Sequence, residues 1–105
     1  MKRLQDKIAL ITGAARGIGA GIARCMAAEG AHIVINDVGN MAAAEATAEE
    51  IRALGSQALI WQADVSDRAA VAAMIEAAVQ HFGRLDIAVA NAAISRRAPF
   101  LEIDW

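Results

Sequence analysis

The sequence contains one cysteine, few aromatic residues and no marked excess of either charge. A single cysteine cannot form an internal disulfide, which is typical of a protein of the reducing cytoplasm. Aromatic residues make up 4% of the chain and hydrophobic residues 57%, so the interior must be aliphatic and rich in alanine. The net charge is −2 and the charged residues are scattered, which argues against a nucleic-acid partner and against a polybasic membrane patch.

Long apolar runs are absent as well. None approaches the roughly 18 residues that cross a bilayer, so we expect no association with a membrane. The N-terminus places basic residues before an apolar run of about five residues, shorter than the roughly 7–15 of a signal peptide, and Asp6 interrupts its approach. We therefore expect no signal peptide. With 105 residues the chain can form one small domain with a modest core.

Short apolar or β-branched runs alternate with stretches of helical periodicity. The runs predict four strands, at residues 7–12, 32–37, 57–64 and 85–91. Three helices are expected between them: one from Ile18 to Gly30, one over 41–54 with Asn40 as N-cap, and one from a cap at Ser66 to Gly83.

The apolar spacing also predicts which residues of the helices face the core. On the first helix these are Ile18, Ile22, Cys25 and Met26. On the third helix they are Val71, Met74, Ile75, Ala78, Val79 and Phe82. Cys25 is therefore expected to be a core residue rather than a reactive thiol. His32 and His81 lie far apart in this pattern and no set of cysteines accompanies them, so we expect no metal site.

The alternation of strands and helices predicts a doubly wound α/β fold, in which helices cover a parallel sheet. With right-handed crossovers the strands, numbered along the chain, take the order 3-2-1-4. The first two helices then cover one face and the third covers the other. One helix covers only part of that second face, and the outer edge of the fourth strand has no hydrogen-bonding partner strand. The sequence therefore looks like part of a larger domain.

Glycines follow the first strand at positions 13, 17, 19 and 21. A strand that leads into glycines opening a helix is typical of phosphate binding, because bare backbone N–H groups and the positive helix end face the ligand. The pattern from Thr12 to Gly19 is T-G-x-x-x-G-x-G, which is neither G-x-G-x-x-G nor a P-loop. Gly13 would allow the turn off the strand, Gly17 the approach of a pyrophosphate, and Gly19 close packing of the helix. A glycine-rich turn that binds no ligand is the alternative.

This motif resembles the signature of the classical short-chain dehydrogenase/reductase family, Rossmann-fold oxidoreductases that use NAD or NADP. The resemblance implies hydride transfer between the nicotinamide and an alcohol or carbonyl carbon of a small-molecule substrate. It also implies a homo-oligomer, commonly a tetramer or a dimer, in the full-length protein. Within the motif it assigns cofactor binding to Gly13, Arg16, Gly17, Ile18 and Gly19.

Asp37 ends the second predicted strand, where the family binds the adenosine ribose. A carboxylate there can accept hydrogen bonds from the ribose hydroxyls and would repel a 2′-phosphate, which favours NAD. Arg16 favours the opposite choice, since a basic residue in the glycine loop can meet a 2′-phosphate. We expect NAD, with NADP as the second candidate. The alternatives are a turn-forming role for Asp37 and a solvated surface charge for Arg16.

Two further segments resemble family motifs. Asp64-Val65 resembles the adenine-binding Asp-Val pair, although Asp64 could instead help Ser66 to cap a helix. Residues 90–94, ANAAI, resemble N-N-A-G; Asn91 and Ala92 match, whereas alanines stand in place of the first Asn and of the Gly. The resemblance assigns Asn91 and Ala92 to the cofactor cleft and implies that Asn91 ties the fourth strand to its neighbours.

The catalytic residues of the family have no counterpart in this sequence. The family uses a serine and a Tyr-x-x-x-Lys motif whose tyrosine is the general acid/base, whereas this chain has no tyrosine and its only lysines are Lys2 and Lys7. We assign no catalytic residue. We expect residues 1–105 to be the N-terminal part of a single NAD(P)-binding domain, inactive alone because the catalytic part is absent. A non-catalytic dinucleotide-binding module or a degenerate truncated copy is the alternative.

Overall fold

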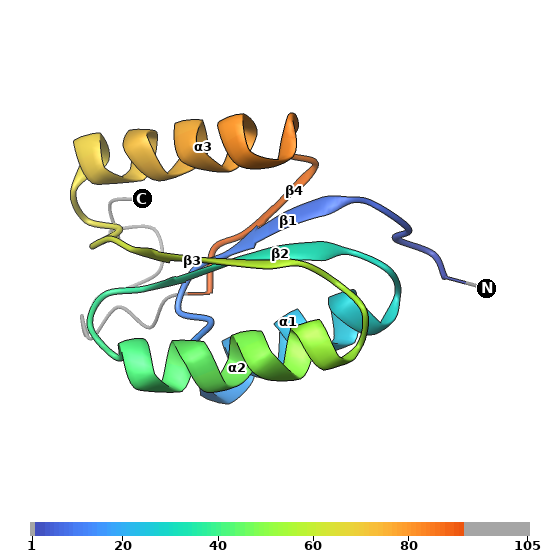
Figure 1. The fold of residues 1–105 in the computed structure, drawn as a ribbon. Coiled ribbons are helices and arrows are strands. Elements are labelled where there is room, and N and C mark those ends of the chain that lie inside the picture. Colours follow the sequence, from blue (N-terminus) through green and yellow to red (C-terminus); the bar gives the residue numbers. More distant parts are fainter. Residues whose placement is uncertain (1, 92–105) are drawn as a thin grey trace, which may run out of the picture.

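The computed structural model describes residues 2–91, which form a four-stranded parallel sheet with helices on both faces (Figure 1). The strands are β1 (Ile8–Ile11), β2 (His32–Asp37), β3 (Ala58–Gln62) and β4 (Ile87–Val89). The helices are α1 (Gly17–Ala28), α2 (Met41–Ala53) and α3 (Arg68–Phe82). All seven predicted elements are present, with small differences at their ends. The prediction for Ala92 lies outside the described residues.

The strand order is β3-β2-β1-β4, and every neighbouring pair is parallel, as predicted. On one side of β1, Ile8 is opposite His32 of β2; on the other, Ala9 is opposite Ile87 of β4. All four strands therefore end at the same edge of the sheet, which we call the carboxyl edge, and the loops that follow them are neighbours.

The helices α1 and α2 cover one face of the sheet and α3 covers the other (Figure 1). Alternate side chains of the strands divide between the two faces. Ala9 and Ile11 belong to the core under α1 and α2, while Leu10 and Val34 belong to the core under α3, beside Met74. This distribution confirms the doubly wound arrangement, with two helices on one face of the sheet and one on the other.

The inner face of α1 differs from the prediction. Its buried residues are Gly19, Ala20, Ala23 and Ala27. Ile18 is 78% exposed and Cys25 is exposed, so the core positions predicted for both residues are wrong. Ile22 and Met26 are half-buried and pack against the margin of the core. Because glycine and alanine let α1 lie close to the sheet, no room remains between them for larger side chains.

The inner face of α3 is narrower than the apolar spacing predicts. Of its six predicted inner residues, Met74 and Ala78 are buried and two are half-buried. Ile75 and Val79 are 40% and 41% exposed. Among the described residues α3 is the only helix on this face, so the exposure agrees with the thin cover expected there.

The ends of α2 and α3 are set by local side chains. Asn40 caps α2 as predicted, with Oδ1 accepting a hydrogen bond from a first-turn N–H at 3.2 Å. The cap of α3 is Asp67 and not Ser66; its Oδ1 accepts from two first-turn N–H groups at 3.0 and 3.2 Å. Gly83 ends α3 in the left-handed conformation, with φ 84°, as predicted.

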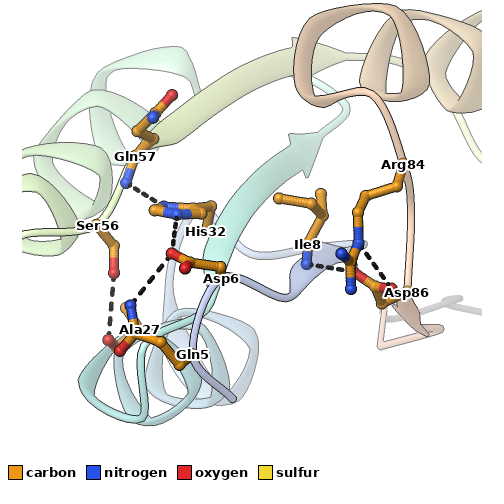
Figure 2. A network of polar contacts seen from close by, with 9 residues as sticks. All are labelled: Gln5, Asp6, Ile8, Ala27, His32, Ser56, Gln57, Arg84 and Asp86. Carbon is orange, nitrogen blue, oxygen red and sulfur yellow. Dashed lines mark hydrogen bonds and ion pairs between the residues drawn. The ribbon is translucent and has the colours of Figure 1, made fainter. Parts of the chain in front are cut away.

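At the opposite, amino edge of the sheet, side chains bind backbone N–H groups of neighbouring strands (Figure 2). Oδ2 of Asp86, just before β4, accepts hydrogen bonds from the N–H of Ile8 at 2.8 Å and from Arg84 Nε at 2.9 Å. Nδ1 of His32 accepts from the N–H of Gln57 at 2.9 Å, which links the start of β2 to the segment that enters β3.

Candidate functional site

The predicted site residues follow the carboxyl ends of the four strands. Gly13 to Gly19 follow β1, Asp37 ends β2, Asp64 and Val65 follow β3, and Asn91 follows β4. The chain leaves β1 toward one face through α1 and reaches β4 from the other face through α3, so the topological switch point lies between β1 and β4. In open α/β sheets, ligands bind in the crevice at this point. The structure therefore brings the predicted residues of the described range to one edge.

The glycine loop, residues 13–19, turns sharply off β1 and brings α1 against it. Gly13 (φ 63°) and Gly17 (φ 65°) have the left-handed backbone that favours glycine. A Cβ on Gly19 would lie 2.5 Å from Asn91 Nδ2 and closer still to the carbonyl oxygen of Gly13, whereas a Cβ on Gly17 would meet nothing within 4 Å. These are the turn and the close packing expected of Gly13 and Gly19. Cofactor binding by the loop stays a prediction.

The first turn of α1 has no side-chain cap. Arg16 is its N-cap residue, with extended backbone and no capping hydrogen bond, and the turn contains no acidic residue. The helices α2 and α3, by contrast, begin with the capping side chains of Asn40 and Asp67. The N–H groups at the start of α1, and the positive end of its dipole, are therefore available to an anion. Arg16, Gly17 and Ile18 are exposed, as access by a ligand requires.

Asn91 joins the end of β4 to the glycine loop. Its backbone N–H donates to Thr12 Oγ1 at 2.9 Å, and its Nδ2 donates to the carbonyl oxygens of Thr12 and Gly13 at 3.3 and 3.4 Å. Thr12 Oγ1 in turn donates to the carbonyl oxygen of Val89 at 3.3 Å. The predicted tie between the fourth strand and its neighbour is confirmed, while contact of Asn91 with a cofactor stays a prediction.

Asp37 lies half-buried at the end of β2 and forms part of a turn. Its Oδ2 accepts a hydrogen bond from the N–H of Asn40 at 3.1 Å, which shapes the connection into α2. Its carbonyl oxygen accepts from the N–H of Ala63 at 3.1 Å, which links it to the loop after β3. The turn-forming role considered for Asp37 is confirmed. Ribose binding remains compatible with it, because the turn uses one carboxylate oxygen.

Asp64 forms a tight turn with Ser66 after β3. Its Oδ1 accepts hydrogen bonds from the N–H of Ser66 at 2.9 Å and from Ser66 Oγ at 2.7 Å. The bond from the N–H, and then that from the hydroxyl, lower the pKa of the Asp64 carboxyl, so this group is ionised at neutral pH. Asp64 thus orients Ser66, although Ser66 is not the cap of α3. Val65 is half-buried and lines a surface hollow together with residues of α3.

Two buried polar residues near this edge are not among the predicted ones. Asn36, in β2, is 1% exposed, and Thr47, in α2, is 3% exposed. Thr47 Oγ1 donates to the carbonyl oxygen of Ala15 at 2.8 Å and so fixes the glycine loop to α2. A signal for them exists in the sequence, since each is a polar residue at a position where the neighbouring pattern of its strand or helix is buried.

Residues 2–91 contain neither a cluster of metal ligands nor a membrane-spanning helix. No three or more His, Cys, Asp and Glu side chains in this range gather where they could hold a metal ion. Over the same range, no helix combines the length and the hydropathy of a membrane span.

The fold and its carboxyl edge define a doubly wound α/β domain with a glycine loop at the switch point. A family model described as short chain dehydrogenase matches residues 7–105, and the chain belongs to that family. This agrees with the resemblance carried by the glycine motif.

Similar proteins extend well past the length of this chain. An uncharacterized oxidoreductase of Methylorubrum extorquens is 44% identical over 103 residues, which are 98% of this chain and 42% of that protein. A short chain dehydrogenase of Burkholderia cenocepacia, solved in complex with NADP, has a TM-score of 0.86 at 42% identity over 97% of this chain and 42% of that one. Carveol dehydrogenase of Mycobacterium avium, solved in complex with NAD, has a TM-score of 0.86 at 31% identity over 99% and 42%.

Proposed function

We propose that this chain is the dinucleotide-binding part of an NAD(P)-dependent oxidoreductase. The observation that carries the proposal is the glycine loop, which opens the uncapped α1 at the switch point of the sheet. Family membership supports it, as do the solved relatives that hold NAD or NADP. Residues 1–105 then form the N-terminal part of a single NAD(P)-binding domain in a protein of about the length of its relatives.

In this proposal, different residues of the carboxyl edge bind different parts of the cofactor. The N–H groups of Gly17, Ile18 and Gly19 bind the pyrophosphate, which their uncapped state permits. The ribose hydroxyls donate to the carboxylate of Asp37, and the adenine lies near the ionised Asp64 and beside Val65. Asn91 and Ala92 line the cleft next to the glycine loop, and Gly13 supplies the turn. The cofactor, when bound, supplies or accepts the hydride.

Asp37 and Arg16 determine the choice between the two cofactors. A carboxylate at the end of β2 repels a 2′-phosphate, and like charges brought together can cost several kcal/mol. Arg16 is exposed at the start of α1 and offers a positive charge to the same phosphate. We propose that Asp37 dominates and that NAD is the preferred cofactor, with NADP bound more weakly.

The chemistry on the substrate falls to residues outside this sequence. Because the chain has no tyrosine, it lacks the general acid/base that its resemblance implies, and we propose that these 105 residues alone are inactive. The whole protein acts on a small-molecule alcohol or carbonyl compound, in the cytoplasm, as a dimer or tetramer. A non-catalytic dinucleotide-binding module is the second candidate.

Titration with NADH and NADPH, followed by nucleotide fluorescence, tests the binding proposal. The protein expressed from its full reading frame should bind NADH more tightly than NADPH, and ADP-ribose should compete. No binding at millimolar NADH refutes the proposal. The DNA beyond the codon for residue 105 separates the two candidates: an open frame with a serine and Tyr-x-x-x-Lys supports the enzyme, and a stop codon supports the module.

A further inference from the structure

We propose that Asn36 is a positioning residue. Its buried amide fixes the loop after β3 and its backbone carbonyl oxygen binds the glycine loop, so that three loops of the dinucleotide site keep one arrangement. The proposal rests on the function proposed above and concerns how that site is kept in shape. The three loops are the glycine loop, the turn that begins at Asp37, and the segment 63–66 after β3.

Asn36 binds the loop after β3 through its side chain. Nδ2 donates hydrogen bonds to the carbonyl oxygens of Trp61 at 3.2 Å and Ala63 at 3.1 Å. Trp61 is the residue opposite Asn36 in the sheet, whereas Ala63 lies beyond the end of β3. The amide therefore extends the pairing of β2 with the next strand past the end of that strand, and fixes the residue directly before Asp64.

The backbone around Asn36 binds the other two loops. Its carbonyl oxygen accepts the N–H of Ala14, in the glycine loop, at 2.9 Å. The next residue, Asp37, accepts the N–H of Ala63 at 3.1 Å through its own carbonyl oxygen. Thr47 completes the arrangement from α2, because its hydroxyl holds the carbonyl oxygen of Ala15 at 2.8 Å. Residues from three loops thus meet around Asn36, whose side chain binds the segment after β3 and whose backbone binds the glycine loop.

A buried amide at this position is costly unless both of its N–H groups are paired. Burial of an unpaired polar group is unfavourable, and β-branched apolar residues suit a buried strand better than asparagine does. The residues before Asn36 in β2, Ile33, Val34 and Ile35, follow that preference and are fully buried. The side chain of Asn36 supplies what an apolar residue cannot, namely two donors, one directed at the carbonyl oxygen of Trp61 in β3 and one at that of Ala63 in the loop after it.

Ser56, in the connection between α2 and β3, provides a control at the opposite edge of the sheet. It is buried, at 8% exposure, and its Oγ donates one hydrogen bond to the carbonyl oxygen of Ala27 at 3.2 Å (Figure 2). This bond lies at the amino edge, before the start of β3, and away from the three loops. Loss of the Ser56 hydroxyl should therefore lower stability without disturbing the nucleotide site.

The test compares Asn36→Asp, Asn36→Ala and Ser56→Ala in the protein expressed from its full reading frame. Asn36→Asp keeps the shape of the side chain but removes both N–H donors and places a carboxylate against two carbonyl oxygens. At a temperature well below every melting transition, we expect the Kd for NADH to rise about tenfold in both Asn36 variants, because the loop after β3 is no longer held in the arrangement that receives the adenosine. The Kd for ADP-ribose should rise by the same factor, because Asn36 acts at the adenosine end.

Ser56→Ala should melt at a lower temperature and bind NADH with the Kd of the unaltered protein. A folded Asn36 variant with an unchanged Kd overturns the positioning role, as does an equal loss of affinity in Ser56→Ala. If Asn36→Asp does not fold, Asn36→Ala decides the outcome alone. If the unaltered protein binds no NADH, the proposed function fails, and the role of Asn36 in it fails as well.

Discussion

The close approach of α1 to the glycine loop can be tested by replacing Gly19 or Gly21 with alanine, one at a time. In Gly19→Ala, the new Cβ would lie 2.5 Å from Asn91 Nδ2 and nearer still to the carbonyl oxygen of Gly13, where real Cβ atoms are not found. In Gly21→Ala the new Cβ meets nothing within 4 Å. Both glycines lie in α1 and neither has a positive φ. The two variants therefore differ mainly in crowding.

The size of the difference follows from that geometry. Replacement of a helical glycine by alanine favours the helix by about 1 kcal/mol, and this gain is similar in the two variants. Overpacking of a filled interior costs about 1–3 kcal/mol and applies to Gly19→Ala alone. In a protein of the length of its relatives, 1 kcal/mol corresponds to about 2–4 °C in melting temperature. Gly19→Ala should therefore melt at least about 2 °C below Gly21→Ala.

Thermal unfolding followed by circular dichroism measures the gap, and NADH titration measures its consequence for the site. Relief of the clash moves the start of α1 away from Gly13 and with it the N–H groups proposed to bind the pyrophosphate, so Gly19→Ala should also bind NADH more weakly. Gly21→Ala should melt no lower than the unaltered chain and keep its affinity. Equal melting temperatures for the two variants would refute the close approach itself, whatever the affinities.

Three further changes test other parts of the argument. Asp37→Ala should weaken NAD binding and raise the affinity for NADP relative to NAD in paired titrations; an unchanged ratio contradicts the ribose role. Hydrogen bonds from Arg84, and then from a backbone N–H, lower the pKa of Asp86, so its stabilising contribution is complete above the ordinary value of about 3.9 and is lost as the pH falls through the lowered value. The difference in melting temperature between the unaltered chain and Asp86→Asn should therefore shrink as the pH is lowered below about 4, and a constant difference contradicts this. The 105 residues alone should associate through the exposed side of α3, and combined Ile75→Lys and Val79→Lys should shift them toward monomer in size-exclusion chromatography; a monodisperse unaltered chain contradicts that.

The strand order could be predicted because it follows from the handedness of the crossovers. Two of the helix ends could be predicted because they depend on local sequence alone. Right-handed crossovers leave few ways to arrange four strands joined by three helices, and the order 3-2-1-4 followed. Asn40 as a cap and Gly83 as a terminator depend only on their own side chains and backbone. Gly13 and Gly19 could be assigned to a turn and a close contact because glycine is the residue that such positions require.

The wrong predictions concern residues whose burial or hydrogen bonds depend on how near another part of the chain lies. Cys25 fits the helical period, yet it is exposed because the alanines and Gly19 set how near α1 lies to the sheet. Ser66 and Asp67 are both residue types that cap helices. Asp67 caps α3 because the side chain of Ser66 is bound to Asp64. The hydrogen-bond partners of Asn36 could not be predicted, since the two carbonyl oxygens that it binds lie 25 and 27 residues further along the chain.

Two side chains hold the glycine loop through its carbonyl oxygens. Thr47 donates to the carbonyl oxygen of Ala15, and Asn91 donates to those of Thr12 and Gly13. At the amino edge, Asp86 and His32 accept from backbone N–H groups, while Ser56 donates to the carbonyl oxygen of Ala27. Because α1 begins without a side-chain cap, its first N–H groups remain as donors at the carboxyl edge, and a pyrophosphate consists of acceptors.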